Sequence, residues 1–100
     1  MARIAVDRER IAEFCRRHHI RRLSFFGSVL RDDFGPDSDV DVLVEFEPGQ
    51  EPGLIRLAGM EFELADILGT EREVELRTPE DLSQYFVKDV VAQAELLYAA

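Results

Sequence analysis

The chain has 100 residues, of which 46% are hydrophobic and 33% charged, and its formal net charge at pH 7 is −9. This length and composition predict one soluble globular domain, residues 1–100, and leave no room for a second domain that would bind a substrate. No apolar run approaches the roughly 20 residues that cross a bilayer, and a single cysteine cannot form an internal disulfide. We therefore expect a cytoplasmic protein that does not bind membranes.

Charge is distributed unevenly along the chain. Residues 1–31 hold eight basic and three acidic residues, a balance of +5, whereas residues 32–100 hold four and eighteen, a balance of −14. Non-specific nucleic-acid affinity depends on cations placed against phosphates, so direct nucleic-acid binding is not expected. Most of these charges are typical of a solvated surface, but the acidic segment also favours a divalent metal or a basic protein partner.

The first half of the chain predicts a helix, a strand and a short helical turn. Asp7 is a good N-cap for a helix whose apolar face follows the i, i+3, i+4, i+7 spacing, through Ile11, Phe14, Cys15 and His18. Residues 23–26 read as a buried strand that ends at Gly27. Ser28 then opens a short helical turn through about Asp32, and residues 35–38 form a turn by composition.

Residues 40–46 predict the clearest strand of the sequence. Because side chains alternate along a strand, one face carries Val40, Val42, Val44 and Phe46, and the other carries Asp39, Asp41, Leu43 and Glu45. The first face is suited to a hydrophobic core, and the second brings two carboxylates together at the start of the strand.

The second half predicts a helix, a short strand and a final helix. An apolar stripe at helical spacing precedes Gly69, a good residue for ending a helix, and residues 73–77 form a third strand. Residues 78–81 begin the next helical piece, and the last helix is expected to pack through Val87, Val90, Val91, Ala94, Leu97 and Tyr98. These elements predict an α/β (α+β) domain, a three-stranded sheet with helices packed against it.

The feature that points to chemistry is Gly27-Ser28, then ten residues, then Asp39-Val40-Asp41. Residues two apart on a strand share a face with Cα atoms about 6.6–7 Å apart. Asp39 and Asp41 can thus reach around one Mg²⁺, or bracket a pair of ions about 3.5–4 Å apart. Mg²⁺ takes one or two carboxylates from a protein and completes its octahedron with water and substrate phosphates.

The residues before the two aspartates are suited to phosphate. Gly27 leaves room for a sharp turn and for close approach of a phosphate, and Ser28 supplies a hydroxyl at the start of a helical turn. Arg31 lies one turn further on the same face, where a guanidinium can neutralise a phosphate oxygen. The segment predicts a site for a nucleoside triphosphate and its Mg²⁺.

Two other patterns are weaker. Cys15-x-x-His18 has the spacing of metal ligands, but no second pair accompanies it, so Cys15 is interpreted as a buried hydrophobe. Ser24 and Ser38 have no histidine placed by sequence to activate them, which argues against a serine hydrolase.

At these residues the chain resembles the minimal nucleotidyltransferase (MNT) domains of the DNA polymerase beta superfamily. Their signature is Gly-Ser, ten residues, Asp-x-Asp, and Gly27-Ser28 with Asp39-Val40-Asp41 matches it without a gap. The resemblance covers nearly the whole chain and implies the nucleotidyltransferase fold with a small mixed sheet. It also implies that Gly27 and Ser28 hold the triphosphate of ATP while Asp39 and Asp41 bind Mg²⁺.

The resemblance also implies a third carboxylate on a later strand, usually an aspartate in a Val-Asp-Leu context. Here that place reads Val74-Glu75-Leu76, so Glu75 is the expected third metal ligand or the acceptor of the attacking hydroxyl's proton. The longer side chain of Glu75 is a departure from the family pattern.

Stand-alone members of this kind resemble MntA-type antitoxins that are paired with HEPN ribonuclease toxins. The implied activity is Mg²⁺-dependent transfer of AMP from ATP to a tyrosine of the toxin, within a hetero-oligomer of the two proteins. One alternative is an antitoxin with little or no catalysis that blocks its toxin sterically, which the acidic segment would favour. A third is an adenylyltransferase for a small molecule such as an aminoglycoside.

Overall fold

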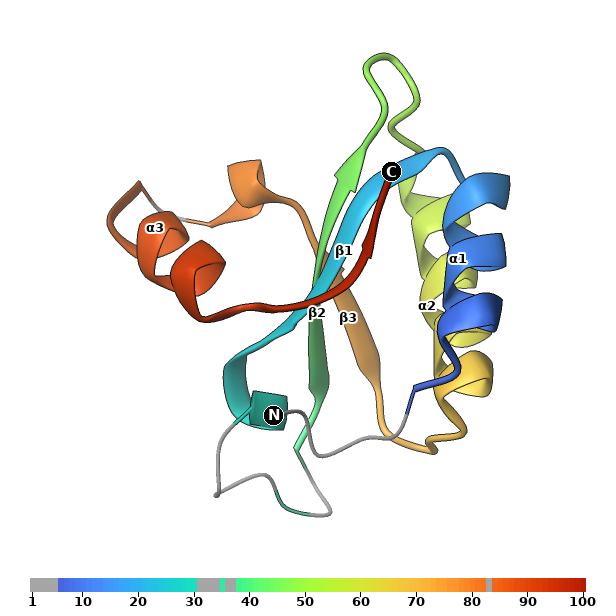
Figure 1. The fold of residues 1–100 in the computed structure, drawn as a ribbon, viewed down its shortest axis with the longest axis horizontal. Helices are drawn as coiled ribbons and strands as arrows, with labels where there is room; N and C mark the ends of the chain where they lie inside the picture. The colour runs from blue at the N-terminus through green and yellow to red at the C-terminus, as the bar shows by residue number, and fades with distance from the viewer. Residues whose placement is uncertain (1–5, 31–34, 36–37, 83) are drawn as a thin grey trace.

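The computed structural model describes residues 6–30, 35, 38–82 and 84–100 (Figure 1). Its sheet has the strand order β3-β2-β1-β4, in which β2 and β3 are parallel and the other pairs are antiparallel. The elements are α1 (Arg8–Arg17), β1 (Ile20–Phe26), the 3-10 helix η1 (Gly27–Leu30), β2 (Val40–Phe46), α2 (Leu54–Leu68), β3 (Val74–Arg77), the 3-10 helix η2 (Pro79–Asp81), α3 (Gln84–Gln93) and β4 (Glu95–Ala99).

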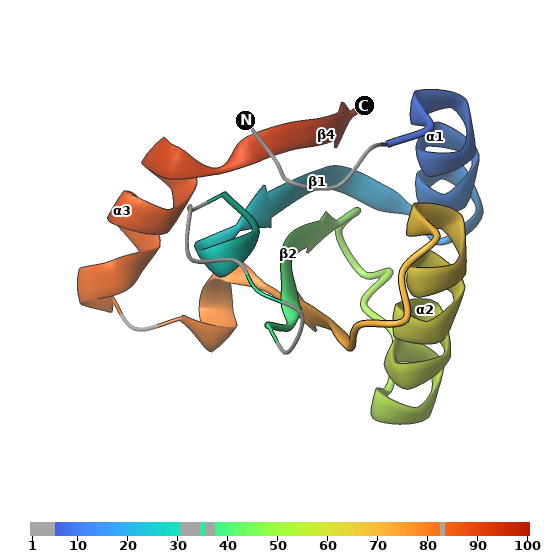
Figure 2. The same ribbon diagram turned by 90° about the horizontal axis from the view of Figure 1, so that it is seen from below.

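Helices α1 and α2 lie side by side on one face of the sheet, while η1 and α3 lie on the other (Figures 1 and 2). The core fills the space between the sheet and the α1–α2 layer, and it includes Phe14, Met60 and Leu64 from the helices with Val42 and Phe25 from the strands. No helix in the described part of the chain is long and apolar enough to cross a membrane.

The sequence signals for the first helix are confirmed. Asp7 is the N-cap of α1, and its Oδ1 accepts hydrogen bonds from the backbone N–H groups of Glu9 and Arg10, at 3.1 and 3.2 Å. These bonds satisfy donors that have no partner inside the helix. Ile11 and Phe14 are fully buried, as the periodicity predicts.

The signals for the second half are confirmed up to η2. Gly69 ends α2 in the left-handed conformation, with φ of 64°. Val74 and Leu76 point into the core from β3. Thr78 and Asp81 form the predicted cap, in which Asp81 Oδ2 accepts from the backbone N–H and the hydroxyl of Thr78, both at 3.1 Å.

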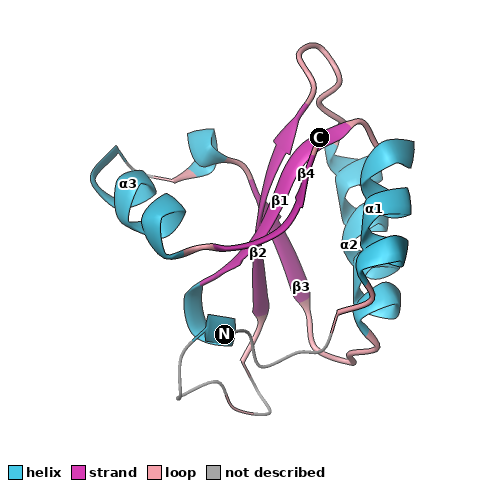
Figure 3. Cartoon of the chain, viewed as in Figure 1, coloured by secondary structure: helices cyan, strands magenta, loops and turns pink. Residues whose placement is uncertain are grey.

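The predicted three-stranded sheet with a last helix running to Tyr98 is wrong in one respect. Helix α3 ends at Gln93, and residues 95–99 form a fourth strand beside β1 (Figure 3). Leu97 is buried and Leu96 is 48% exposed, an alternation typical of a strand. Without β4, β1 would expose the unpaired backbone groups of an edge strand. Short apolar runs such as Leu96-Leu97-Tyr98 fit either period, so the local pattern did not decide between them.

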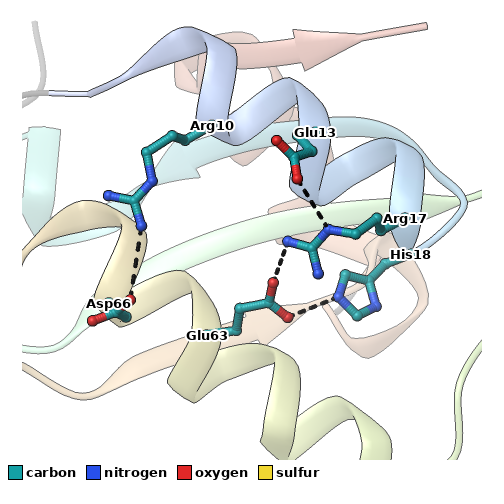
Figure 4. A network of polar contacts seen from close by, with 6 residues as sticks. All are labelled: Arg10, Glu13, Arg17, His18, Glu63 and Asp66. Carbon is teal, nitrogen blue, oxygen red and sulfur yellow. Dashed lines mark hydrogen bonds and ion pairs between the residues drawn. The ribbon is translucent and has the colours of Figure 1, made fainter.

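A network of ion pairs joins α1 to α2 on their outer side (Figure 4). Glu63 on α2 accepts from Arg17, and its Oε1 lies 2.9 Å from Nε2 of His18. Arg10 and Asp66 form a second, looser bridge at 3.7 Å. Partial burial raises the pKa of the Glu63 carboxyl, but the hydrogen bonds from Arg17 and His18 outweigh it and leave that pKa below its ordinary value.

Glu63→Gln is expected to lower the free energy of unfolding by up to about 1 kcal/mol at pH 7. Because the folded pKa of Glu63 is lowered, its contribution is present above the unfolded value of about 4.3 and is lost as the pH falls through the folded value. Urea unfolding from pH 7 to pH 3 should show the difference between wild type and variant shrinking in acid. Glu51→Gln, in an exposed loop, is the control. A difference that is constant across this range would contradict the assignment.

Candidate functional site

The two aspartates lie on the sheet face that α1 and α2 do not cover. Val40 and Val42 are fully buried in the core against those helices. Side chains alternate along β2, so Asp41 points to the opposite face, and Asp39, one pleat earlier, leaves the chain on that same side. Asp39 is exposed and Asp41 is half-buried. Both carboxylates are thus placed where a ligand from solvent can reach them.

Strand pairing fixes what lies beside Asp41. The antiparallel partner of Asp41 on β1 is Phe26, the residue before Gly27, and its parallel partner on β3 is Glu75. Paired residues share a sheet face, so Glu75 lies next to Asp41. The backbone N–H of Val40 donates to the carbonyl of Glu73 at 2.8 Å and holds the start of β2 against β3.

Gly27 lies directly against the Asp41 carboxylate. Its φ is +74°, a conformation that residues with a side chain rarely adopt. A Cβ built on Gly27 would lie 2.6 Å from Asp41 Oδ2, closer than any real side chain tolerates. The glycine is therefore required both by the turn and by the acid. The structure thus brings the Gly-Ser turn and the second aspartate into direct contact.

Only part of the segment predicted to bind phosphate lies within the described residues. Gly27–Leu30 forms the short helical turn predicted after β1, as a 3-10 helix, and Ser28 lies in its first part. Arg31 and the predicted end of this turn near Asp32 lie outside the described residues. The roles of Ser28 and Arg31 toward phosphate stay predictions.

Glu75 has the placement expected of a third acid, but its carboxylate is paired with a neighbour. Its Oε2 accepts from Nη2 of Arg77 at 3.3 Å, and 32% of its side chain is exposed. Across residues 6–30, 35, 38–82 and 84–100, no three acidic, histidine or cysteine side chains are grouped closely enough to hold a metal ion. The role of Glu75 as metal ligand or base stays a prediction.

The donor set fits Mg²⁺ without a third protein ligand. Asp39 and Asp41 supply two carboxylates on one face, and Mg²⁺ usually takes one or two carboxylates from a protein. The space that a Cβ would fill at Gly27 opens directly onto Asp41 Oδ2. Cys15 is no competitor, because burial raises the pKa of its thiol to about 12 despite the opposing charge of Arg16. The interpretation of Cys15 as a core residue is confirmed.

Arg72, which is not among the predicted site residues, ties the two acid-bearing strands together. Its Nη1 donates to the carbonyl of Gly35 and, at 3.3 Å, to that of Ser38, the residue before Asp39. The same turn is closed by Ser38, whose N–H donates to the Gly35 carbonyl and whose Oγ accepts from the Gly35 N–H, both at 3.1 Å. Arg72 precedes β3 by two residues, and nothing in its local sequence indicates this contact.

Arg72→Ala is expected to raise the Mg²⁺ concentration required for nucleotide binding about tenfold, because the turn that delivers Asp39 loses its clamp. Arg72→Lys should restore this only in part, since a lysine cannot present the forked donors of a guanidinium. Mg²⁺ titrations of nucleotide binding, followed by calorimetry, would measure the shift. Arg56→Ala, exposed on α2, is the matched control. An unchanged Mg²⁺ requirement in Arg72→Ala would contradict the role of the clamp.

Comparison with known proteins identifies a matching family and relatives of similar sequence. The pattern described as the nucleotidyltransferase domain matches residues 8–97. A candidate protein adenylyltransferase of Methanocaldococcus jannaschii is 40% identical over 58 residues, which are 58% of this chain and 60% of that protein. The protein adenylyltransferase MntA of Thermococcus cleftensis is 33% identical over 66 residues, which are 66% of this chain and 65% of that protein. The chain thus spans slightly less than two thirds of these curated relatives.

Solved structures share the fold. A candidate minimal nucleotidyltransferase superposes with a TM-score of 0.69 at 33% identity, over 87% of this chain and 85% of that one. A toxin–antitoxin structure with AMP-PNP gives a TM-score of 0.70 at 21% identity, over 95% and 75%. The MNT antitoxin bound to a tri-AMPylated HEPN toxin of Shewanella oneidensis gives 0.63 at 20% identity, over 93% and 70%. The last two likenesses, below 25% identity, establish the fold alone.

Proposed function

Because the chain belongs to the nucleotidyltransferase domain family, we propose that it transfers AMP from ATP, with Mg²⁺, to a tyrosine hydroxyl of a partner HEPN ribonuclease toxin. In this role it is the antitoxin of the pair. The names of its relatives and the AMPylated toxin in a similar complex support the choice of reaction and partner.

The observation that carries the proposal is the contact between Gly27 and Asp41. A glycine held at φ of +74°, with its missing Cβ 2.6 Å from a carboxylate oxygen, joins a phosphate-binding turn to a metal-binding acid. Strand pairing brings position 27 beside position 41, but the core does not need an acid at position 41, since Asp41 points away from the helices. A nucleotide whose phosphates contact both the turn and a metal held by Asp41 would explain why the turn and the acid are adjacent.

Each part of the site then has a role. Asp39 and Asp41 would hold Mg²⁺, which when bound neutralises charge on the phosphates and aligns them. Backbone N–H groups at Gly27 and Ser28 would hold the β- and γ-phosphates. The hydroxyl oxygen bonds to the α-phosphorus while the bond from that phosphorus to the bridging oxygen breaks, and pyrophosphate leaves. Glu75, freed from Arg77, would accept the hydroxyl proton.

Incubation of the purified protein with ATP, Mg²⁺ and a candidate HEPN partner tests this proposal. The intact mass of the partner is expected to rise by one or more AMP units, and its ribonuclease activity to fall. Asp39→Ala and Asp41→Ala should abolish both effects. Inhibition of the ribonuclease by both variants, without a mass change, would instead establish an antitoxin that acts by steric blocking.

A further inference from the structure

A small cavity lies on the same sheet face as Asp41, beneath the end of α3. Its volume is about 260 Å³. Ser24 and Leu43 form its floor, and Val91, Ala94 and Leu96 line its wall. We call this cavity the α3 slot. No local sequence pattern marks it, because its residues come from four separate elements.

Strand register places the α3 slot one row of side chains away from the metal site. Leu43 follows Asp41 by two residues on the same face of β2, a step of about 6.6–7 Å. Ser24 pairs with Leu43 on one side and with Leu96 on the other. The row Leu96, Ser24, Leu43 therefore runs parallel to the row Phe26, Asp41, Glu75.

The lining of the slot selects against charged ligands. Ser24 and Leu43 are 4% and 3% exposed. Among the residues with described burial, Ser24 is the one polar residue that is buried. At the far end Arg22 Nε lies 3.9 Å from Glu45 Oε2, so the positive charge there is already paired. Apolar walls with one hydroxyl suit a flat, uncharged ring with hydrogen-bonding edges. The volume lies below the roughly 300–1,000 Å³ that encloses a drug-sized ligand, so one ring system fits and a whole nucleotide does not.

The line along which the phosphoryl group is transferred limits where the nucleoside can lie relative to the slot. The attacking and leaving oxygens of a phosphoryl transfer lie roughly in line. Gly27 follows β1, on one side of Asp41, and Glu75 lies on β3, on the other. If pyrophosphate leaves toward Gly27 and the hydroxyl arrives beside Glu75, the line of transfer crosses the strands. The nucleoside stays bonded to the α-phosphorus as an equatorial substituent, so it must extend roughly perpendicular to the line of transfer. One such direction runs along β2 to the slot.

We propose that the α3 slot holds the base of the nucleotide, a purine, while the phosphates bind at Gly27 and Asp41. This inference rests on the proposed function and adds the residues that recognise the base. The acceptor tyrosine is a poorer occupant, because the slot lies toward β1 and β4, whereas Glu75 is on β3.

Tryptophan at the half-exposed wall of the slot tests the proposal. Leu96 and Val91 are 48% and 46% exposed, so Leu96→Trp and Val91→Trp can fill the slot without disturbing the core. Leu54→Trp, at an 85% exposed position on α2, is the matched control. Calorimetry with Mg²⁺ would compare ATP with inorganic tripolyphosphate, which has phosphates but no base. Circular dichroism would verify that each variant is folded.

Both slot variants are expected to weaken ATP binding at least about tenfold and to leave tripolyphosphate binding unchanged, whereas Leu54→Trp should change neither. Wild-type ATP affinity in both folded slot variants, or an equal loss of tripolyphosphate, would overturn the base site. So would a wild-type protein that binds ATP no more tightly than tripolyphosphate. A wild-type protein that binds neither ligand would overturn the proposed function and the base site with it.

Discussion

Asp41→Asn is expected to lower the rate of AMP transfer by about 10³-fold while the fold persists. Asparagine keeps the size of the side chain but removes the charge that the proposed metal site requires. Loss of several kcal/mol of charge stabilisation in the transition state corresponds to a change of this size. The initial rate of partner AMPylation, measured by intact mass, checks the expectation.

Asp66→Asn is the control for this variant. Asp66 is 85% exposed on α2, so the substitution removes the same charge from the helical layer on the opposite face of the sheet. It should leave the rate of AMP transfer unchanged. An Asp41→Asn protein that transfers AMP within threefold of wild type would remove the metal role from this residue. An equal loss in both variants would point to net charge instead of a specific site.

Gly27→Ala is expected to abolish nucleotide binding and to lower the free energy of unfolding. The new Cβ meets Asp41 Oδ2 at 2.6 Å, so the carboxylate must move away from the turn or the turn away from the strand. In addition, alanine at φ of +74° costs about 1–2 kcal/mol in backbone strain. Calorimetric titration with ATP and Mg²⁺, together with urea unfolding, would separate the two effects.

Gly49→Ala supplies the matched control. Gly49 has almost the same conformation, φ of +78°, but a Cβ there meets nothing within 4 Å. It should show the strain of about 1–2 kcal/mol and retain full ATP affinity. If Gly49→Ala weakened ATP binding as much as Gly27→Ala, general destabilisation would explain the loss and the contact with Asp41 would not.

The turn at Gly27 and the strand face that carries the two aspartates were predictable from local rules, whereas the contact between Gly27 and Asp41 depends on the register of β1 with β2. A glycine between a buried strand and a helical turn indicates a tight change of direction. Alternation along residues 40–46 puts Asp39 and Asp41 on the face away from the valines. The structure confirms both, through the left-handed Gly27 and the fully buried Val40 and Val42.

The features that the sequence did not reveal depend on long-range pairing. Residues 95–99 form β4 because β1 is available as a partner, and their own apolar pattern fits a helix equally well. Arg72 contacts a turn that lies more than thirty residues earlier in the chain. The α3 slot follows from strand register, which no local pattern specifies. The alignment of Glu75 with Asp41 follows from the same register, and only the family resemblance indicated it.

The most direct test of the central claim is to follow the two ends of the triphosphate separately. The protein, Mg²⁺ and the partner HEPN protein would be incubated with ATP labelled either at the α-phosphate or at the γ-phosphate. We predict that label from the α-phosphate becomes covalently bound to the partner, while label from the γ-phosphate appears in free pyrophosphate. Label from the γ-phosphate on the partner, or no covalent label with the partner nevertheless inhibited, would contradict the claim.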